Sequence, residues 1–299
     1  MQTDWTAVDW GTTHLRAWAM GPDGRVLAQY SSDKGMGVLD RDGFEPALLE
    51  LVGDWLGDGP TDVVACGMVG ARQGWVEANY TPVPAKVSAT GLTLAPTSHP
   101  KLRVHIQPGM SQSSPADVMR GEETQIAGYL ATRPTFDGVL CLPGTHSKWA
   151  QISAEEVVSF RSFMTGELFS LMSRQSVLRH GMGTGWDEKA FDAAVDEVLS
   201  KPEMFAARLF AIRAEGLLHD LPPDAARSRL SGYLIGAEIA ATKPYWLGQP
   251  VVLIGDAGLS ALYTRALKAQ GAECRLENAE TMTLAGLKAA RAAMKGTAS

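Results

Sequence analysis

The chain has 299 residues, of which 45% are hydrophobic and 20% charged, with a net charge of −6 and a pI near 5.6. This length and composition predict a soluble globular protein with room for two domains. The acidic balance, without a block of Lys or Arg, argues against nucleic acid or an anionic membrane as the main partner and favours a small molecule.

Cysteine spacing and the N-terminus indicate the compartment. Cys66, Cys141 and Cys274 are far apart, and two of them lie in apolar, strand-like runs, so we expect buried thiols and no disulfide framework. The chain opens without a basic segment followed by an apolar core, and it contains no apolar, uncharged run of about eighteen residues. We therefore expect a cytoplasmic protein. The sequence leaves homo-oligomerisation open.

The first motif is an apolar strand that ends at Asp9, turns through Gly11, Thr12 and Thr13, and returns as a second strand. Gly11 lets the backbone approach an oxyanion closely, and both threonines can donate to phosphate oxygens. Asp9 can meet a hydrated Mg²⁺, and Arg16 adds a bidentate donor. The motif predicts a site for Mg-nucleotide phosphates, although an ordinary tight hairpin explains the same residues.

The rest of the first half reads as alternating elements: strands over 26–30, 62–66 and 104–107, a helix over 44–56, and loop with edge strands over 71–100. Ser114 as N-cap and Pro115 at the first helical position predict a further helix. It runs, with a break at Gly121, to Leu130, and ends before Pro134.

The second half repeats this order: strands over 138–142, 148–152, 157–163, 251–254 and 273–276, with helices over 166–178, 186–199, 202–214, 225–241, 259–270 and 281–294. The fold class is therefore α/β. We expect an N-terminal domain over 1–134, with the first phosphate loop and the catalytic carboxylate. A C-terminal domain over 135–299 then holds a second phosphate loop and an adenosine-binding turn.

Two turns in the second half have ligand-binding character. Gly144, Thr145, His146 and Lys148 offer amides, a hydroxyl, an imidazole and an ammonium in one compact stretch, which suits β- and γ-phosphates, although a polar hairpin explains them too. The other turn joins a strand to a helix and contains Gly255, Ala257 and Gly258. Bare backbone there can receive adenine or ribose, and a helix N-terminus favours anions.

The order of these three turns resembles the actin and sugar-kinase superfamily. More narrowly, five segments are similar to the 2-dehydro-3-deoxygalactonokinase family, and the resemblance covers essentially the whole chain. The segments are Asp9-Trp10-Gly11-Thr12-Thr13, the run from Gly67 to Trp75, Arg120-Gly121-Glu122-Glu123-Thr124-Gln125, the run from Leu142 to Trp149, and Phe163-Met164-Thr165-Gly166-Glu167.

This resemblance implies two ribonuclease-H-like, actin-like ATPase domains with an interdomain cleft. It implies a kinase that uses ATP and Mg²⁺ to phosphorylate the terminal hydroxyl of 2-dehydro-3-deoxy-D-galactonate to the 6-phosphate. Phosphoryl transfer needs a carboxylate that orients the accepting hydroxyl. The matching segment offers Glu122 as our first choice, with Glu123 in reserve, since helical spacing does not separate them. Both could instead be solvated glutamates that favour a helix N-terminus.

Contacts to the sugar acid are expected from side chains that match its groups. Arg72 or Arg161 suits the carboxylate, since guanidinium matches carboxylate geometry. The sugar hydroxyls could meet further polar residues: Asn79, Tyr80, Thr165 and Glu167. Each of these could equally be an ion pair or a loop anchor. Trp75 and Trp149 are expected in the core.

Two other classes remain open at this point. An actin-like nucleotide switch would use the same phosphate loops and hydrolyse ATP without a small-molecule acceptor. An exopolyphosphatase-like phosphohydrolase also combines Gly-Glu-Glu with two phosphate loops. Other kinase frameworks are disfavoured because the chain has neither a Gly-Lys dipeptide for a P-loop nor a His-Arg-Asp catalytic loop.

Overall fold

The computed structural model describes residues 3–87 and 91–297. Contacts between Cα atoms divide the chain into two compact units, which are described separately here. Unit 1 comprises Met1–Phe136, Ile152–Ser159 and Ala279–Ser299, and unit 2 comprises Asp137–Gln151 and Phe160–Asn278. Within the described ranges, no helix has both the length and the apolar character needed to cross a membrane.

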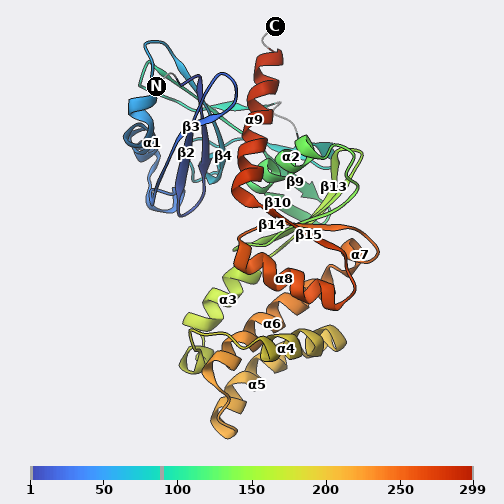
Figure 1. Cartoon of the computed structure of the whole chain (residues 1–299). Coiled ribbons are helices and arrows are strands. Elements are labelled where there is room, and N and C mark those ends of the chain that lie inside the picture. The colour runs from blue at the N-terminus through green and yellow to red at the C-terminus, as the bar shows by residue number, and fades with distance from the viewer. Residues whose placement is uncertain (1–2, 88–90, 298–299) are drawn as a thin grey trace. The chain divides into compact units, whose positions relative to one another are not determined.

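Unit 1 is built on a sheet of order β3-β2-β1-β4-β8-β7 (Figure 1). Its strands are β1 (Trp5–Trp10), β2 (Leu15–Met20), β3 (Val26–Ser32), β4 (Thr61–Gly67), β7 (Thr93–Leu94) and β8 (Leu102–Ile106). The predicted hairpin is confirmed, since β1 pairs antiparallel with β2. β4 pairs in parallel with both β1 and β8, so the ends of β1, β4 and β8 share one edge of the sheet.

Helices cover both faces of this sheet because side chains alternate along each strand. Val8 and Trp10 of β1 pack in one cluster with Phe44 and Leu48 of α1 (Phe44–Val52). Ala7 points to the other face, in a cluster with residues of α9 (Ala279–Thr297). Burying a side chain such as Phe44 contributes about 1.5–3 kcal/mol, so each face helps to anchor its helix.

The segment before the Gly-Glu-Glu motif differs from the predicted helix over 114–130. It forms strand β10 (Ala116–Met119), which pairs antiparallel with β9 (Gly109–Ser113), and β9 pairs in turn with β5 (Tyr80–Pro82). Helix α2 (Glu122–Thr132) starts only after Gly121, whose φ of 110° no right-handed helix contains. The prediction from Ser114 and Pro115 was wrong because these residues form the turn of a hairpin instead.

The last helix packs against α2 and so belongs to unit 1, whereas the sequence suggested the second domain. An added Cβ at Gly128 of α2 would lie 1.9 Å from the carbonyl oxygen of Met282, and one at Gly286 of α9 would lie 1.9 Å from that of Thr124. Two glycines therefore allow backbone contact between the helices. The side-by-side course of α2 and α9 follows from this contact (Figure 1).

The third sheet has the order β15-β14-β11-β12-β13-β6. Its strands are β6 (Ala85–Lys86), β11 (Gly138–Leu142), β12 (Ser147–Ser153), β13 (Glu156–Phe163), β14 (Val251–Gly255) and β15 (Cys274–Asn278). β14 pairs in parallel with β11 and β15. The short strand β6 pairs with the start of β13, in the part of β13 that is counted with unit 1.

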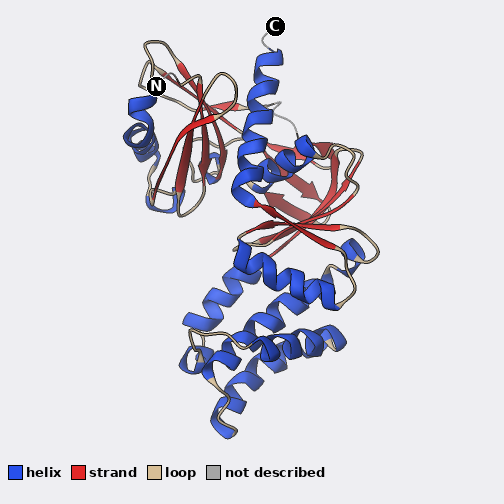
Figure 2. Ribbon diagram, viewed as in Figure 1, coloured by secondary structure: helices blue, strands red, loops and turns tan. Residues whose placement is uncertain are grey.

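Five helices of unit 2 agree with the predicted ones within a few residues: α3 (Thr165–Arg174), α4 (Glu188–Ser200), α5 (Phe205–Leu218), α6 (Pro223–Ala241) and α8 (Ala257–Ala269). The short helix α7 (Lys243–Trp246) was not predicted. Figure 2 shows α4, α5 and α6 gathered into a helical bundle. Gly232 and Gly236 bring α6 close to α4, since an added Cβ at Gly232 would lie 2.6 Å from the carbonyl oxygen of Phe191.

Two predictions about buried side chains are confirmed. Trp75 and Trp149 are 5% and 0% exposed and lie in the cores of unit 1 and unit 2 respectively. Cys66 and Cys141 are buried free thiols, and Cys274 is a partly buried one.

Candidate active site

The first phosphate loop is a tight turn at the end of β1. The amide of Gly11 donates to the carbonyl oxygen of His14 at 2.9 Å and closes the turn. Thr12 and Thr13 are both exposed, so their hydroxyl groups are accessible to a ligand. The loop therefore has the open donors that its sequence predicts.

Residues 35–37 form hydrogen bonds to this loop. The sequence analysis did not single out this segment. Gly35 donates to the carbonyl oxygen of Thr13 at 3.2 Å, and Gly37 donates to that of Thr12 at 2.8 Å. An added Cβ at Gly35 would lie 2.3 Å from the carbonyl carbon of Thr13, so only glycine fits. The Gly-Met-Gly spacing after β3 was the available signal. The amides of this segment donate to carbonyl groups of the loop and thereby hold its shape.

Asp9 and Arg16 form an ion pair across the β1–β2 hairpin, where they are cross-strand partners. Nη2 of Arg16 donates to Oδ2 of Asp9 at 2.7 Å, and the Asp9 side chain is 16% exposed. Burial raises the pKa of Asp9, while Arg16 opposes that shift. Arg16 also lies 3.7 Å from Glu280 of α9, so it bridges two carboxylates. The predicted metal ligand and the predicted phosphate donor thus meet in one site.

The ends of β1 and β4 and the start of α2 come together beside this pair. The thiol of Cys66 lies 3.9 Å from Oδ1 of Asp9, and Gly67 follows with a φ of 93°. An added Cβ at Gly67 would lie 2.6 Å from the carbonyl oxygen of Trp10, and one at Gly121 would lie 3.4 Å from the Cα of Gly67. Close backbone contact therefore places the Gly-Glu-Glu motif beside the strand that carries Asp9.

The two glutamates of this motif have different surroundings. Glu122 is partly buried, and its Oε2 accepts from the amide of Arg120 at 3.1 Å. Glu123 is 2% exposed, and its two oxygens accept from the amide of Gly121 at 2.9 and 2.7 Å. Burial, with a smaller contribution from Glu122, raises the pKa of Glu123 to about 7. The tertiary structure thus separates two residues that periodicity could not.

The predicted sugar-acid residues of unit 1 lie on the segment that follows β4. Arg72 has an 80% exposed side chain and lies 3.3 Å from Glu77. Asn79 and Tyr80 are exposed, and the guanidinium of Arg120 lies 4.3 Å from the centre of the Tyr80 ring. Arg72 is therefore an exposed cation in an ion pair with Glu77, whereas Tyr80 lies over a second, buried arginine.

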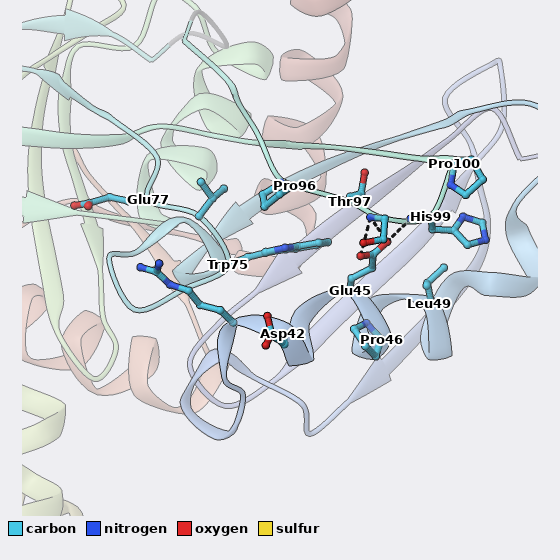
Figure 3. Close-up of a pocket in the computed structure, with 13 residues that line it drawn as sticks. Asp42, Glu45, Pro46, Leu49, Trp75, Glu77, Pro96, Thr97, His99 and Pro100 are labelled. Atoms are coloured by element: carbon cyan, nitrogen blue, oxygen red, sulfur yellow. Dashed lines mark hydrogen bonds between the residues drawn. The ribbon is translucent and has the colours of Figure 1, made fainter.

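A cavity of about 1090 Å³ lies between α1 and residues 96–100 (Figure 3). Glu45 spans it, since its carboxylate accepts from the amides of Ser98, at 2.9 and 3.0 Å, and His99, at 2.7 Å. Trp75 lines its wall, and the nearby Arg41 donates to the carbonyl oxygen of Arg72 at 3.0 Å. None of the predicted site residues lines this cavity.

The second phosphate loop lies in unit 2 and is held by the start of α3. Glu167 donates its amide to the carbonyl oxygen of Thr145 at 3.0 Å, and an added Cβ at Gly166 would lie 2.4 Å from the carbonyl oxygen of Gly144. His146 pairs with Glu167 at 2.6 Å. The structure therefore joins residues that were predicted separately as phosphate and substrate contacts.

Lys148 is placed differently from an exposed phosphate clamp. Lys148 is 4% exposed, and its Nζ donates to the carbonyl oxygen of His146 at 3.3 Å. Thr145 and His146 are the exposed members of this loop, while Gly144 is half-buried. In this conformation the open donors come from the tip of the loop, and the ammonium group supports its backbone.

A buried carboxylate that the sequence analysis missed lies beneath this loop. Glu238 of α6 is 2% exposed and accepts from Nε1 of Trp149 at 2.7 Å, from the hydroxyl of Tyr263 at 2.7 Å and from the hydroxyl of Thr165. Ser147 is 3.0 Å from the Tyr263 hydroxyl and extends the network. Burial raises the pKa of Glu238, and these donors oppose the shift. One helical position thereby ties β12, α3 and α8 together.

A pocket of about 390 Å³ opens beside the second loop. Its polar wall contains Thr145, Thr165 and Arg227, and its apolar wall includes Trp186 and Phe169. The guanidinium of Arg227 lies 5.1 Å from the centre of the Phe169 ring, and Trp186 is 39% exposed. Pockets that combine flat apolar walls with a few polar groups suit a heteroaromatic ligand.

The predicted adenosine-binding turn lies at the start of α8 but outside the lining of this pocket. Asp256 caps the helix by accepting from the amides of Gly258, at 2.9 Å, and Leu259, at 3.1 Å. Gly255 packs toward the second loop, since an added Cβ there would lie 3.2 Å from the carbonyl oxygen of Pro143. Ala257 and Gly258 are exposed. The later residues Leu259, Leu262 and Tyr263 of α8 line the pocket instead.

The remaining predicted residue, Arg161, lies on β13 in unit 2. It is partly buried, and its Nη1 lies 3.5 Å from the carbonyl oxygen of Phe160.

Metal ligands are sparse: among residues 3–87 and 91–297, no group of three His, Cys, Asp or Glu side chains is arranged to hold a metal ion. A divalent cation would need a ligand's oxygens and water beside the single carboxylate of Asp9.

Known proteins similar to this chain match it over nearly its whole length. The sequence model of the family described as 2-keto-3-deoxy-galactonokinase matches residues 9–290. The "Probable 2-dehydro-3-deoxygalactonokinase DgoK1" of Rhizobium meliloti (strain 1021) is 38% identical over 297 residues, 97% of each chain. The 2-dehydro-3-deoxygalactonokinase of Escherichia coli (strain K12) is 35% identical over 292 residues, 96% of this chain and 97% of the relative.

Solved structures give the same result for the fold. A crystal structure of a Sinorhizobium meliloti protein that carries the same kinase name has a TM-score of 0.91 at 38% identity, covering 97% of this chain and 99% of that chain. The activator of 2-hydroxyisocaproyl-CoA dehydratase from Clostridium difficile, with bound ADPNP, has a TM-score of 0.51 at 11% identity and covers 98% of this chain and 97% of that chain, which shows the fold alone. The predicted α/β fold of two ribonuclease-H-like domains is confirmed.

Proposed function

Because this chain belongs to the 2-keto-3-deoxy-galactonokinase family, we propose that it transfers the γ-phosphoryl group of ATP to the terminal hydroxyl of 2-dehydro-3-deoxy-D-galactonate. The product is the 6-phosphate, and the step belongs to galactonate degradation. The family match over residues 9–290 carries this proposal. The family resemblance that we inferred from the motifs is confirmed by that match.

The arrangement in unit 1 supports phosphoryl transfer. This reaction depends mainly on positioning and on neutralising charge at the transferred group. The open donors of Thr12 and Thr13, the Asp9–Arg16 pair and the Gly-Glu-Glu motif gather at one edge of the sheet. A γ-phosphate at the loop can therefore be met by hydroxyl groups, a guanidinium and a nearby carboxylate.

We assign the role of general base to Glu122. A base must come within about 3 Å of the hydroxyl proton that it accepts. Glu122 is partly open, whereas Glu123 is 2% exposed and both its oxygens are engaged by the amide of Gly121. Glu123 then anchors the start of α2 and keeps Glu122 in place. A result in which only Glu123 is needed for transfer would reverse this assignment.

The pocket of unit 2 is our proposed site for the adenine base. Trp186 and the Arg227–Phe169 pair offer flat surfaces on which a base can stack, and Thr145 at its rim can donate to phosphate. We propose that the turn with Gly255, Ala257 and Gly258 helps to shape this pocket through its backbone. We propose the same role for His146 and Lys148 of the second loop.

We propose Mg²⁺ as the accompanying ion. The carboxylate of Asp9 is 16% exposed and stands next to the first loop, which suits an ion that keeps most of its waters and is shared with phosphate. When bound, Mg²⁺ would neutralise charge on the triphosphate. Arg16 already offsets the charge of Asp9 and remains beside it to contact a phosphate oxygen.

A coupled assay of ATP consumption tests the proposed reaction. The panel contains 2-keto-3-deoxy sugar acids, aldonates and neutral hexoses, with polyphosphate and an acceptor-free sample alongside. We expect turnover with 2-dehydro-3-deoxy-D-galactonate and a product phosphorylated at C6. Turnover only with neutral hexoses would contradict the sugar-acid claim. Orthophosphate release from polyphosphate, or steady ATP hydrolysis without an acceptor, would instead support the phosphohydrolase or the nucleotide switch.

A further inference from the structure

Arg120 is a buried cation with unused hydrogen-bond donors. The residue is 8% exposed, and its Nη2 donates to the carbonyl oxygen of Ala78 at 2.7 Å. Its Nε and Nη1 are buried as well, and within the part of the chain that the structure describes they have no hydrogen-bond acceptor. A buried donor without an acceptor is unfavourable, and more so on a charged group, so an arginine with a purely structural role would normally have all its donors paired.

The position of this arginine relates it to the reaction. Its own amide donates to Glu122, the proposed base, at 3.1 Å, and its charge lowers the pKa of Glu123 against the larger upward effect of burial. Its guanidinium lies under the ring of Tyr80, 4.3 Å from the centre. An added Cβ at Gly70 would lie 2.9 Å from Nη1, so Gly70 leaves the room that the group occupies.

We propose that Arg120 determines specificity by receiving the carboxylate of the sugar acid, in place of the more exposed Arg72 or Arg161. This inference rests on the proposed kinase function. A guanidinium is the side chain best suited to a carboxylate, and Nε and Nη1 each keep an N–H donor that no acceptor among the described residues takes. The proposal requires the ring of Tyr80, which covers the guanidinium and is 38% exposed, to move aside when the carboxylate binds.

The dimensions of substrate and protein support this placement. The carboxylate and the accepting hydroxyl lie at opposite ends of a six-carbon chain, whose five C–C bonds of about 1.5 Å span roughly 6 Å. Glu122 lies at the backbone end of Arg120, and the guanidinium lies at the other end of a side chain of about the same length. One sugar acid can therefore reach the base with one end and the cation with the other.

The test compares the sugar acid with its primary amide, which is neutral at the recognised end. We expect wild type to prefer the acid in kcat/KM by on the order of a hundredfold or more, because an amide leaves the buried cation unpaired. In Arg120→Met this preference should fall to within about tenfold, with the KM for ATP unchanged. Arg120→Lys should keep part of it, and this variant also covers the case in which Arg120→Met fails to fold.

Arg72→Met and Arg161→Met are the matched controls and should keep the preference of wild type. An unchanged acid-to-amide ratio of kcat/KM in Arg120→Met or Arg120→Lys, even with a large loss of kcat, would overturn the inference. Loss of a residue with a purely structural role would lower kcat/KM for both substrates alike. A collapse of the ratio in Arg72→Met or Arg161→Met would move the role to that arginine. Failure of wild type to phosphorylate the acid would contradict the proposed function itself, which separates the two results.

Discussion

The amide of Gly121 donates to both carboxylate oxygens of Glu123, at 2.9 and 2.7 Å. This contact holds the first turn of α2 at the positive φ of Gly121, where the chain leaves β10. A carboxylate that is 2% exposed would normally be neutralised by a cation, but here it is held mainly by backbone and hydroxyl donors. Burial, with a smaller contribution from Glu122, outweighs these donors and raises the pKa of Glu123 to about 7.

Stability should therefore depend on the protonation of Glu123. Its folded pKa of about 7 exceeds the ordinary value of 4.5, so between these limits the folded chain holds more protons than the unfolded chain. The contribution to stability is present below pH 4.5 and is lost as the pH rises through about 7, by about 3 kcal/mol at most. Glu123→Gln removes this titration and should flatten the pH dependence of the thermal unfolding midpoint between pH 5 and 8. Glu188→Gln, at an exposed ion pair with Arg265, is the control, and an equal slope in Glu123→Gln and wild type would contradict the prediction.

Glu122→Gln should abolish transfer while nucleotide binding is kept. The amide cannot accept the proton of the sugar hydroxyl, and we expect kcat to fall on the order of 10²- to 10⁴-fold, the usual range for a general base. ATP affinity, measured by titration, should stay near wild type because the proposed pocket for adenine lies in unit 2, whereas Glu122 belongs to unit 1. Unchanged turnover at saturating sugar acid would exclude Glu122 from this role.

Asp9→Asn should lower turnover on the order of a hundredfold or more, which is the usual loss when one positioned electrostatic group is removed. The change also leaves Arg16 without its 2.7 Å partner. The measurement is kcat at saturating ATP over a series of Mg²⁺ concentrations. Asp23→Asn, at a surface ion pair with Arg25, controls for the loss of charge and should behave as wild type. A near-normal rate with an unchanged Mg²⁺ dependence would argue against a metal-binding role.

Gly35→Ala should distort the first phosphate loop, because the added methyl group would meet the carbonyl carbon of Thr13 at 2.3 Å. A displacement of about 1 Å at a reacting group can cost on the order of a hundredfold in rate, and we expect kcat/KM for ATP to fall by at least tenfold. Gly57→Ala adds the same methyl group where nothing lies within 4 Å, so its kinetics should be unchanged. Equal kinetics of the two variants would show that the loop tolerates the shift.

Glu238→Gln should weaken nucleotide binding without changing the KM for the sugar acid. The amide nitrogen faces groups that now donate to a carboxylate, so Tyr263 and Thr165, which line the pocket, lose their common acceptor. We expect an increase in the Kd for ATP on the order of tenfold, together with a lower unfolding midpoint. Glu188→Gln, at an exposed ion pair with Arg265, provides the comparison. A Kd that does not differ between these variants would limit Glu238 to a role in stability.

Local patterns predicted most of the fold correctly. The alternation of strands and helices, the β1–β2 hairpin and the two loops lie where their residues indicated, since apolar period and turn residues act over short distances. The helix predicted from Ser114 failed because Ser-Pro also suits a hairpin turn, and pairing between β9 and β10 decided between the two. Which strand pairs with which depends on the tertiary structure, so the local sequence pattern does not predict it.

The candidate site divides in the same way. Residue chemistry singled out Asp9 and the first loop, and the family resemblance pointed to the pair Glu122 and Glu123. It did not indicate that Arg16 would be the ion-pair partner of Asp9, that Glu123 would be buried, or that Lys148 would support backbone. Burial and partners depend on which distant segments pack together, and only the folded chain defines them.

By itself, the order of residues determined the fold class, the position of the loops and the family, because each rests on short motifs and their spacing. Only the tertiary structure decided that α9 returns to pack on α2 and that Gly35 supports Thr13. It also decided that two buried donors of Arg120 find no acceptor among the residues that the structure describes. These are contacts between segments far apart in the chain. Their energies depend on the exclusion of water, which no local pattern records.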